Sequence, residues 1–168
     1  MTPPMPANKG IPMGDVEILV EQVEIATDRA AVRRAIEAGQ PASPAEQIRK
    51  GLALYNLDSA SELISPLNVY LRDAGGQLQG GLLGRTGASA LFIETLWMAE
   101  PFRRRGYGRQ VVLTAEREAA RRGCHFAHVD TFSFHAPSFY RRLGYEVFGV
   151  LDGYKSGHIR YFFKKALA

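Results

Sequence analysis

Apolar and polar residues follow two different periods along the first half of the chain. The mixture of Val, Ile and Leu with Glu at Val16–Val23 predicts a strand. Helical spacing follows over 28–38, which Thr27 or Asp28 can cap, and again over 44–55, where a proline occupies the first helical position. We therefore expect one strand and two helices at the start of the fold.

The period then changes to the alternation that is typical of strands. Three stretches with this pattern are expected to be consecutive strands: Asn68–Arg72, Gln77–Arg85 and Ala88–Met98. The separators 73–76 and 86–87 are short and contain glycine, as hairpin turns do. This spacing favours an antiparallel meander.

The second half alternates helices with strands. Gly106–Arg122 has Val111 and Val112 on one face and turns Arg109 and Glu116 away from it, which predicts an amphipathic helix. Further elements are expected as a strand at Phe126–Thr131, a short helix at Ala136–Leu143, and strands at Tyr145–Val150 and His158–Lys164. This order predicts the α/β class, of the α+β type: a mixed, mostly antiparallel sheet of about six or seven strands, flanked by about four helices.

Composition limits what such a chain can be. Its 168 residues are enough for one domain, expected at 16–168 after a flexible lead-in at 1–15. With 46% hydrophobic and 23% charged residues it has the composition of a globular protein, and no apolar run approaches the roughly 18 residues of a membrane span. The one cysteine, Cys124, cannot form an internal disulfide or a multi-cysteine metal site, so we expect a cytoplasmic protein without a metal.

Charge is distributed unevenly along the chain. Residues 1–84 carry 7 basic and 10 acidic side chains, whereas residues 85–168 carry 14 and 7. The basic half favours an anionic ligand: nucleic acid, a membrane surface or a phosphorylated small molecule. Much of its charge lies at one helix start and on helix flanks, without the interleaved aromatic residues of nucleic-acid surfaces, so we expect neither nucleic acid nor membrane as a partner.

The stretch from Leu96 to Arg109 carries chemistry that decides among these ligands. A strand ends there, a turn with three arginines and two glycines follows, and a long helix begins. Unpaired N–H groups at a helix start bind phosphate, Gly106 and Gly108 allow close approach to the backbone, and arginines add charge-assisted bonds. The ending of a P-loop and the third glycine of a dinucleotide fingerprint are both missing. The segment therefore predicts a pyrophosphate site.

Two motifs in this half resemble those of a known family. Arg103-x-x-Gly106-x-Gly108 after a strand is similar to the R/Q-x-x-G-x-G/A signature of the GNAT acetyltransferases. The segment from Ala136 to Tyr145 resembles that family's A-x-x-x-Y-x-x-x-G-[FY] segment. The resemblance covers about residues 16–167. It implies a GNAT-like acyl-CoA N-acyltransferase fold and an N-acetyltransferase that moves the acetyl group of acetyl-CoA to a primary amine by direct attack.

The resemblance also implies which residues bind acetyl-CoA. Strand backbone would pair with the pantetheine arm, loop amides would hold the pyrophosphate, and two later residues would add contacts. The corresponding positions are Leu96, Trp97 and Met98 in the strand, Arg103, Arg104, Arg105, Gly106, Tyr107, Gly108 and Arg109 in the loop, and Ser133 and Tyr140 downstream. Ser133 stands where the family often has Asn, which leaves a shorter side chain for that contact.

Tyr140 matches the family's general acid, which protonates the departing CoA thiolate. An ordinary phenol has a pKa of about 10 and a thiol about 8.5, so the transfer is mildly uphill without help. We therefore expect positive charge or a helix end near Tyr140 to narrow this gap.

The general base has two main candidates. By simple alternation, Glu94 lies on the same side of its strand as Phe92, Leu96 and Met98, where a carboxylate is either in a cleft or buried at high cost. His128 lies on the next strand and has an ordinary pKa of about 6.5. Asp130, which shares its face, and water alone are further alternatives.

The acceptor amine has no readable motif. A small molecule is favoured over a protein, and the acidic first half, which helps wall the acceptor site, favours a cationic amine. Dimers are common in the family, so the resemblance allows a homodimer. The competing hypothesis is a non-catalytic acyl-CoA-binding or sensor module on the same fold, against which Tyr140 and Glu94 argue.

Overall fold

The computed structural model describes residues 16–21, 28–59 and 63–167. Within these ranges the elements are, in chain order, β1 (Val16–Val20), α1 (Arg29–Ala38), α2 (Pro44–Ser59), β2 (Ser65–Asp73), β3 (Leu78–Gly87), β4 (Ala90–Met98), the 3₁₀ turn η1 (Glu100–Phe102), α3 (Tyr107–Arg121), β5 (Phe126–Phe132), α4 (Pro137–Arg142), β6 (Glu146–Leu151) and β7 (Arg160–Ala166). The expected lead-in at 1–15 lies outside the described residues, as do Thr27 and the end of the first predicted strand.

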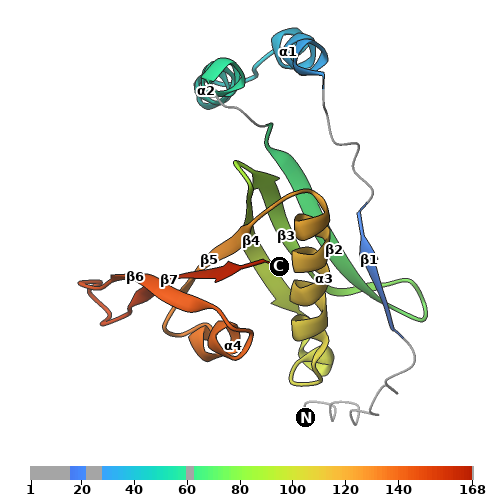
Figure 1. Cartoon of the computed structure of the whole chain (residues 1–168), viewed down its shortest axis with the longest axis vertical. Helices are drawn as coiled ribbons and strands as arrows, with labels where there is room; N and C mark the ends of the chain where they lie inside the picture. The colour runs from blue at the N-terminus through green and yellow to red at the C-terminus, as the bar shows by residue number, and fades with distance from the viewer. Residues whose placement is uncertain (1–15, 22–27, 60–62, 168) are drawn as a thin grey trace, which may run out of the picture.

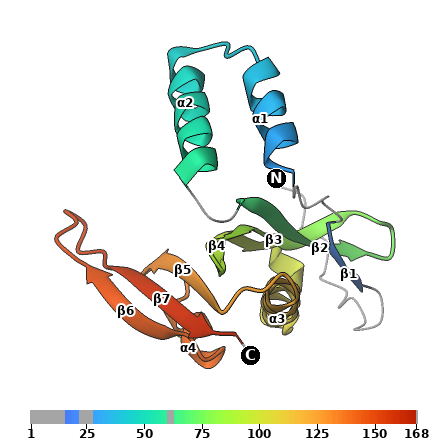
Figure 2. The same cartoon turned by 45° about the horizontal axis from the view of Figure 1, so that its top comes forward.

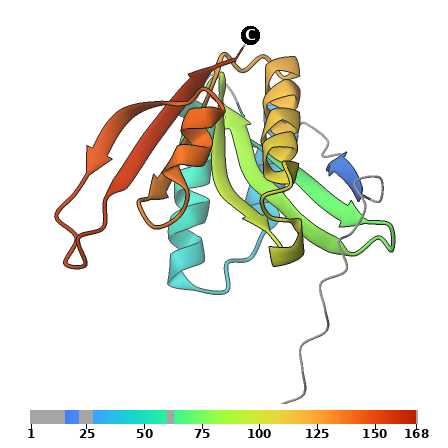
Figure 3. The same cartoon turned by 90° about the horizontal axis from the view of Figure 1, so that it is seen from below.

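The described strands form one mixed sheet in the order β1-β2-β3-β4-β5-β7-β6. Neighbouring strands are antiparallel except β4 and β5, which are parallel. The predicted fold class and sheet are therefore confirmed. Helix α3 crosses one face of the sheet (Figure 1), and the α1–α2 hairpin stands on the opposite side (Figure 2). The view from below places α4 on the side of α3, with α2 behind the sheet (Figure 3).

Local sequence explains several element boundaries. Asp28 caps α1 by accepting the amide hydrogen of Ala30 at 2.8 Å. The β3–β4 hairpin turns at Ala88 and Ser89, which both have positive φ, so the turn lies two residues after the predicted one. Helix α2 continues to Ser59, four residues beyond its predicted end.

The core lies between the sheet and α3. Fully buried side chains from both layers meet there: Leu67, Val69, Leu71, Leu82, Leu91, Val111, Val112 and Ala115. Helical periodicity predicts that Glu116 points away from this core. Instead Glu116 is buried, because Lys165 of β7 meets its carboxylate at 2.6 Å. The ion pair joins α3 to the far part of the sheet.

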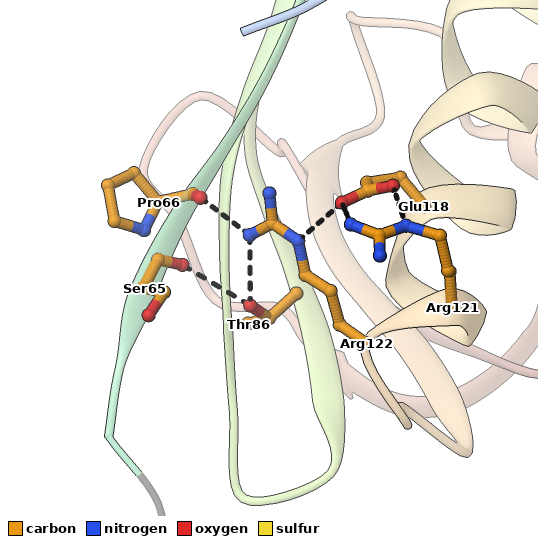
Figure 4. A network of polar contacts seen from close by, with 6 residues as sticks. All are labelled: Ser65, Pro66, Thr86, Glu118, Arg121 and Arg122. Atoms are coloured by element: carbon orange, nitrogen blue, oxygen red, sulfur yellow. Dashed lines mark hydrogen bonds and ion pairs between the residues drawn. The ribbon is translucent and has the colours of Figure 1, made fainter. Parts of the chain in front are cut away.

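A polar network fastens the end of α3 to β2 and β3 (Figure 4). Arg122 donates to the Glu118 carboxylate at 2.8 Å, to the carbonyl of Pro66 at 2.7 Å and to the hydroxyl of Thr86 at 3.4 Å. Arg121 binds the same carboxylate through Nε and Nη2, both at 2.8 Å. Hydrogen bonds from Arg121 and then Arg122 lower the pKa of Glu118 to about 2, against the opposing effect of burial. The network fixes the carboxyl end of the helix whose amino end begins the site.

Candidate active site

A β-bulge interrupts β4 at Glu94. The pairing with β3 passes from Thr95 directly to Ile93, so Glu94 is the extra residue. A bulge reverses the alternation, which places Phe92 on one face of the sheet and Leu96 on the other. The prediction that Glu94 shares a side with Phe92, Leu96 and Met98 is therefore wrong for the last two. Glu94 lies on the face of Phe92, where both meet the same arginine.

Strands β4 and β5 part at the same point. They pair from Ala90 with Phe126 to Ile93 with Val129, and the pairing stops there. Among the described residues, the backbone of 94–98 therefore has no strand partner at one edge, toward which alternate residues turn their N–H and C=O groups. This divergence of β4 from β5, called the splay below, begins at the bulge.

The loop after β4 forms a tight turn into α3. Arg103 Nε donates to the carbonyl oxygen of Met98 at 2.9 Å, which ties the loop to the end of the strand. Arg104 and Gly106 both have left-handed backbone, with φ of 59° and 86°. Gly106 is the N-cap of α3 and supplies no side-chain cap, so the first amides of the helix can meet an anion.

Gly108 lies in the first turn of α3, against Phe139 and Met98. An added Cβ would lie 3.7 Å from the Phe139 ring and 3.9 Å from Met98, which are ordinary contact distances. The protein without a ligand can therefore accommodate Ala at this position. A requirement for glycine here would come from a molecule bound against the helix start.

The other residues predicted to bind acetyl-CoA differ in what they expose. The side chain of Tyr107 is buried against Phe102, so it would reach a ligand through its backbone amide. The Oγ of Ser133 accepts the amide hydrogen of Ile159 at 3.2 Å and so links the end of β5 to the start of β7. Arg104 and Arg109 are exposed, Arg105 is half-buried, and Trp97 is 52% exposed, whereas Leu96 is half-buried and Met98 is buried.

Tyr140, in α4, is buried among aromatic rings. The centroids of Phe139, Tyr145 and Phe163 lie 5.1, 5.7 and 5.9 Å from its own. Burial, together with the negative charge of Asp130, raises the pKa of Tyr140 to about 12. The expectation that positive charge narrows the gap to a thiol is therefore wrong, because the gap is wider than for an ordinary phenol. The phenol keeps its proton throughout the neutral pH range.

The two main base candidates lie on the other face of the sheet. The Glu94 carboxylate forms an ion pair with Arg85 Nη1 at 2.6 Å, and its side chain is 37% exposed. His128 stacks on Phe92, with ring centroids 4.7 Å apart. Burial and then the charge of Arg85 lower the pKa of His128 below its ordinary 6.5, against the opposing effect of Asp130. The imidazole is therefore neutral at pH 7 and can accept a proton.

Asp130 is already engaged by another side chain. Its carboxylate accepts from Arg160 Nε at 2.6 Å. Asp130 shares the face of His128, as alternation along β5 predicts. The candidate acid, Tyr140, and the base candidates thus approach the splay from opposite faces of the sheet.

A cavity of about 650 Å³ lies between the α1–α2 hairpin and the face that carries His128. Its walls include Val32 of α1, Leu52 of α2, and Arg85, Ala90, Phe92 and His128 of the sheet. Phe92 and His128 face each other across β4 and β5, one step before the last pair. The cavity therefore adjoins the point at which the strands part.

This architecture can be compared with known proteins. The Acetyltransferase (GNAT) family model matches residues 32–145, which is more than half of the chain. The chain belongs to the GNAT family of acetyltransferases. Its GNAT motifs lie at the end of β4 and in α4, where the geometry above places the splay and Tyr140.

Individual GNAT relatives agree in sequence and in fold. Acetyltransferase Atu2258 of Agrobacterium fabrum is 34% identical over 111 residues, which cover 66% of this chain and 81% of the relative. Blasticidin-S acetyltransferase of Streptomyces morookaense is 35% identical over 96 residues, which cover 55% of this chain and 71% of that relative. A crystal structure described as an acetyltransferase from Agrobacterium tumefaciens matches with a TM-score of 0.68 at 30% identity, covering 76% of this chain and 94% of that one.

Membership of the GNAT family establishes the chemistry at the level of the class. The protein is an acyltransferase that uses acetyl-CoA as its cosubstrate, and the interpretation as a non-catalytic module is set aside. Among the described residues, no group of three or more His, Cys, Asp or Glu side chains could hold a metal ion. No helix in the described ranges is long and apolar enough to cross a membrane.

Sequence patterns missed three polar residues that line this cavity: Arg49, Asn56 and Arg85. Arg85 was detectable as an isolated charge in an apolar, glycine-rich strand, where a charge needs a partner. Arg49 and Asn56 are seven residues apart and so lie on one side of α2. Nothing in the local sequence of α2 indicates that this side of the helix faces a cavity.

Proposed function

We propose that this GNAT protein transfers the acetyl group of acetyl-CoA to a primary amine of a small molecule. The placement of the cavity carries the proposal: its floor is the Phe92–His128 pair, so an amine there would meet a thioester at the open edge of β4. The volume of about 650 Å³ and the largely apolar walls are typical of small-molecule sites. The relative named for blasticidin S, and not for a protein, supports the same class of acceptor.

The open edge of β4 and the start of α3 suit acetyl-CoA. Backbone groups of 94–98 would pair with the pantetheine arm, because no strand in the described part of the chain pairs with that edge. The amides of 104–109, at the positive end of the α3 dipole, would hold the pyrophosphate. Exposed Arg104 and Arg109 would add charge, whereas Arg103 positions the loop through Met98.

The reaction would proceed by direct attack. The amine nitrogen attacks the thioester carbonyl carbon and the C–N bond forms. The nitrogen then loses its second proton to solvent, and the carbon–sulfur bond breaks. A strand amide near Leu96–Met98 would stabilise the oxyanion in between. The sulfur takes a proton from Tyr140 as the bond breaks, and solvent returns a proton to the phenolate. Because its pKa is about 12, Tyr140 is in its donor form whenever a substrate binds near neutral pH.

The amine is protonated in water and must lose a proton before it attacks. Glu94 and His128 both lie on the cavity side of the sheet, so either can accept that proton. The variants Glu94→Gln and His128→Asn separate them: the base is the residue whose replacement removes the acidic limb of the kcat/KM profile. For His128 this limb lies below about pH 6.5, because its pKa is lowered.

Thiol release from acetyl-CoA tests the proposal across a panel of alkylamines, amino acids and peptides with free amino groups. We expect turnover of small amines and none of the peptides. Tyr140→Phe keeps the aromatic ring but removes the hydroxyl group that would donate the proton. We therefore expect kcat to fall by about 10²- to 10⁴-fold, while the Kd for acetyl-CoA stays nearly unchanged. Wild-type kcat in this variant at every pH would remove Tyr140 from the mechanism. Faster acetylation of peptides than of small amines would contradict the acceptor class.

Further expectations belong to this proposal. A single domain at 16–168, a cytoplasmic location and a homodimer all stay predictions. Limited proteolysis, cell fractionation and sedimentation analysis test them in that order. A monomer at all concentrations would contradict the homodimer without affecting the proposed reaction.

A further inference from the structure

The acceptor cavity carries positive charge. Most of its described lining residues are apolar, and the polar side chains among them are Arg49, Asn56, Arg85 and His128. Neither Asp nor Glu occurs among the described lining residues. The described lining therefore lacks the acidic groups on which the expectation of a cationic acceptor rests.

The two arginines of the cavity differ in their surroundings. Arg85 is paired with Glu94 at 2.6 Å and lies over the Phe92 ring, 5.0 Å from its centroid. Arg49, by contrast, has no hydrogen bond, ion pair or ring contact with any other described residue. A guanidinium in a cavity wall without a protein partner attracts an anion, and its planar fork matches the geometry of a carboxylate.

Helix α2 presents Arg49 together with apolar surface and an amide. Arg49 and Asn56 are two helical turns apart, so they lie on one side of α2 with about 10 Å between them along its axis. Leu52 and Ala53, which lie between them, also line the cavity. A ligand that follows this side of the helix would meet a cation, then apolar surface, then an amide.

Resting on the proposed acetyltransferase activity, we propose that the acceptor is an amine with a carboxylate at the far end of an apolar chain, and that Arg49 selects it. The carboxylate pairs with Arg49 on α2, and the chain lies against the apolar walls. The amine points to the sheet floor at His128, beside the splay. Arg85 cannot take the place of Arg49, because Glu94 already neutralises it.

Matched substrates test the selection. Thiol release is measured with 4-aminobutanoate, 6-aminohexanoate and 8-aminooctanoate, each beside the alkylamine of the same length. For the length that spans the cavity, we expect the amino acid to have a KM lower by about tenfold or more. Arg49→Gln should bring the ratio of the two KM values close to one. Arg34→Gln, an equal loss of charge at an exposed arginine of α1 outside the cavity lining, should leave the ratio as it is.

Calorimetry in the absence of acetyl-CoA separates binding from turnover. We expect 6-aminohexanoate to bind the wild-type protein more tightly than Arg49→Gln, with a smaller difference for hexylamine. Equal affinity of the acid for both proteins, or equal KM for acid and alkylamine at every length, would overturn the inference. Absence of thiol release with every amine would refute the proposed function instead, and Arg49-dependent binding of the acid would still support the anion site.

Discussion

The two sides of the proposed active site are built differently: the donor side is α3 with the loop before it, and the acceptor side is the α1–α2 hairpin. Helix α3, which begins at the donor loop, buries six of its fifteen residues: Tyr107, Val111, Val112, Ala115, Glu116 and Ala119. Across the described span of α1 no side chain is buried, and α2 buries Leu57 alone. Three large apolar side chains of α2, Ile48, Leu52 and Tyr55, are 73%, 58% and 67% exposed. The core thus holds the donor side, whereas the acceptor side lies largely outside it.

Polar contacts join the two helices of the acceptor side. Lys50 Nζ donates to the carbonyl oxygens of Glu37 and Gly39 at 2.7 and 2.8 Å, and Arg33 pairs with Asp58. Such contacts contribute less to stability than buried apolar packing does. We infer that residues of α1 and α2 over the cavity can be replaced at small cost to the free energy of folding. Replacements there can therefore alter the preference for the acceptor without disturbing the proposed acetyl-CoA site.

The largest expected contrast is between two leucines. Leu82 is fully buried in the core, so Leu82→Ala should lower the free energy of unfolding by roughly 2–5 kcal/mol. Leu52→Ala in α2 should change it by no more than about 0.5 kcal/mol, because 58% of that side chain is exposed. Urea unfolding measures both. A cost for Leu52→Ala equal to that of Leu82→Ala would break the comparison.

A second contrast uses glycines from the two sides. Gly108→Val puts a side chain where the pyrophosphate is proposed to lie, so the Kd for acetyl-CoA should rise about tenfold or more. Gly51→Ala in α2, where an added Cβ has nothing within 4 Å, is the control and should leave that Kd unchanged. Calorimetric titration gives both values. Wild-type affinity in Gly108→Val would contradict the assignment of the loop.

The network at the end of α3 gives the donor side a pH dependence. The pKa of Glu118 is lowered to about 2 from an ordinary value near 4.3, so its stabilising effect is present above about pH 5 and is lost as the pH falls toward 2. Solvent screens part of the attraction, so we expect Glu118→Gln to cost about 1 kcal/mol at pH 7. Thermal unfolding between pH 7 and pH 3 should show the difference from wild type shrinking. A difference that is constant with pH, or one equal to that of the exposed Glu146→Gln, would contradict this account.

The smallest effect is expected in the acceptor hairpin. Lys50→Gln removes the donor that links α2 to the end of α1, so amide hydrogen exchange in both helices should quicken by a few-fold. Exchange in α3 should stay as it is, because that helix is held by the core. Faster exchange in α3 as well would show that the two sides are one cooperative unit.

Much of the donor side was predictable from local sequence. The Arg-rich turn with Gly106 and Gly108 is a contiguous motif, and its position between a strand and a helix follows from the change in hydrophobic period. The order of β2, β3 and β4 could be anticipated, because short glycine-containing separators favour antiparallel pairing of consecutive strands. The environment of Tyr140 could not be anticipated, because its burial and the nearby charge of Asp130 come from segments that are distant in sequence. Both raise the pKa of Tyr140, whereas the sequence led us to expect a lowered pKa.

Short-range patterns therefore define the helices and strands of this protein and the loop proposed to bind acetyl-CoA, since both depend on neighbours along the chain. Packing between distant segments decides on which face of the sheet or side of a helix a residue lies. The bulge at Glu94 reverses an alternation that the residues alone do not mark, and Lys165 draws Glu116 inward against its helical period. The cavity that makes Arg49 a ligand-binding candidate exists because a hairpin from the first half stands over strands from the second. Its shape depends on tertiary contacts, which no period along the chain encodes.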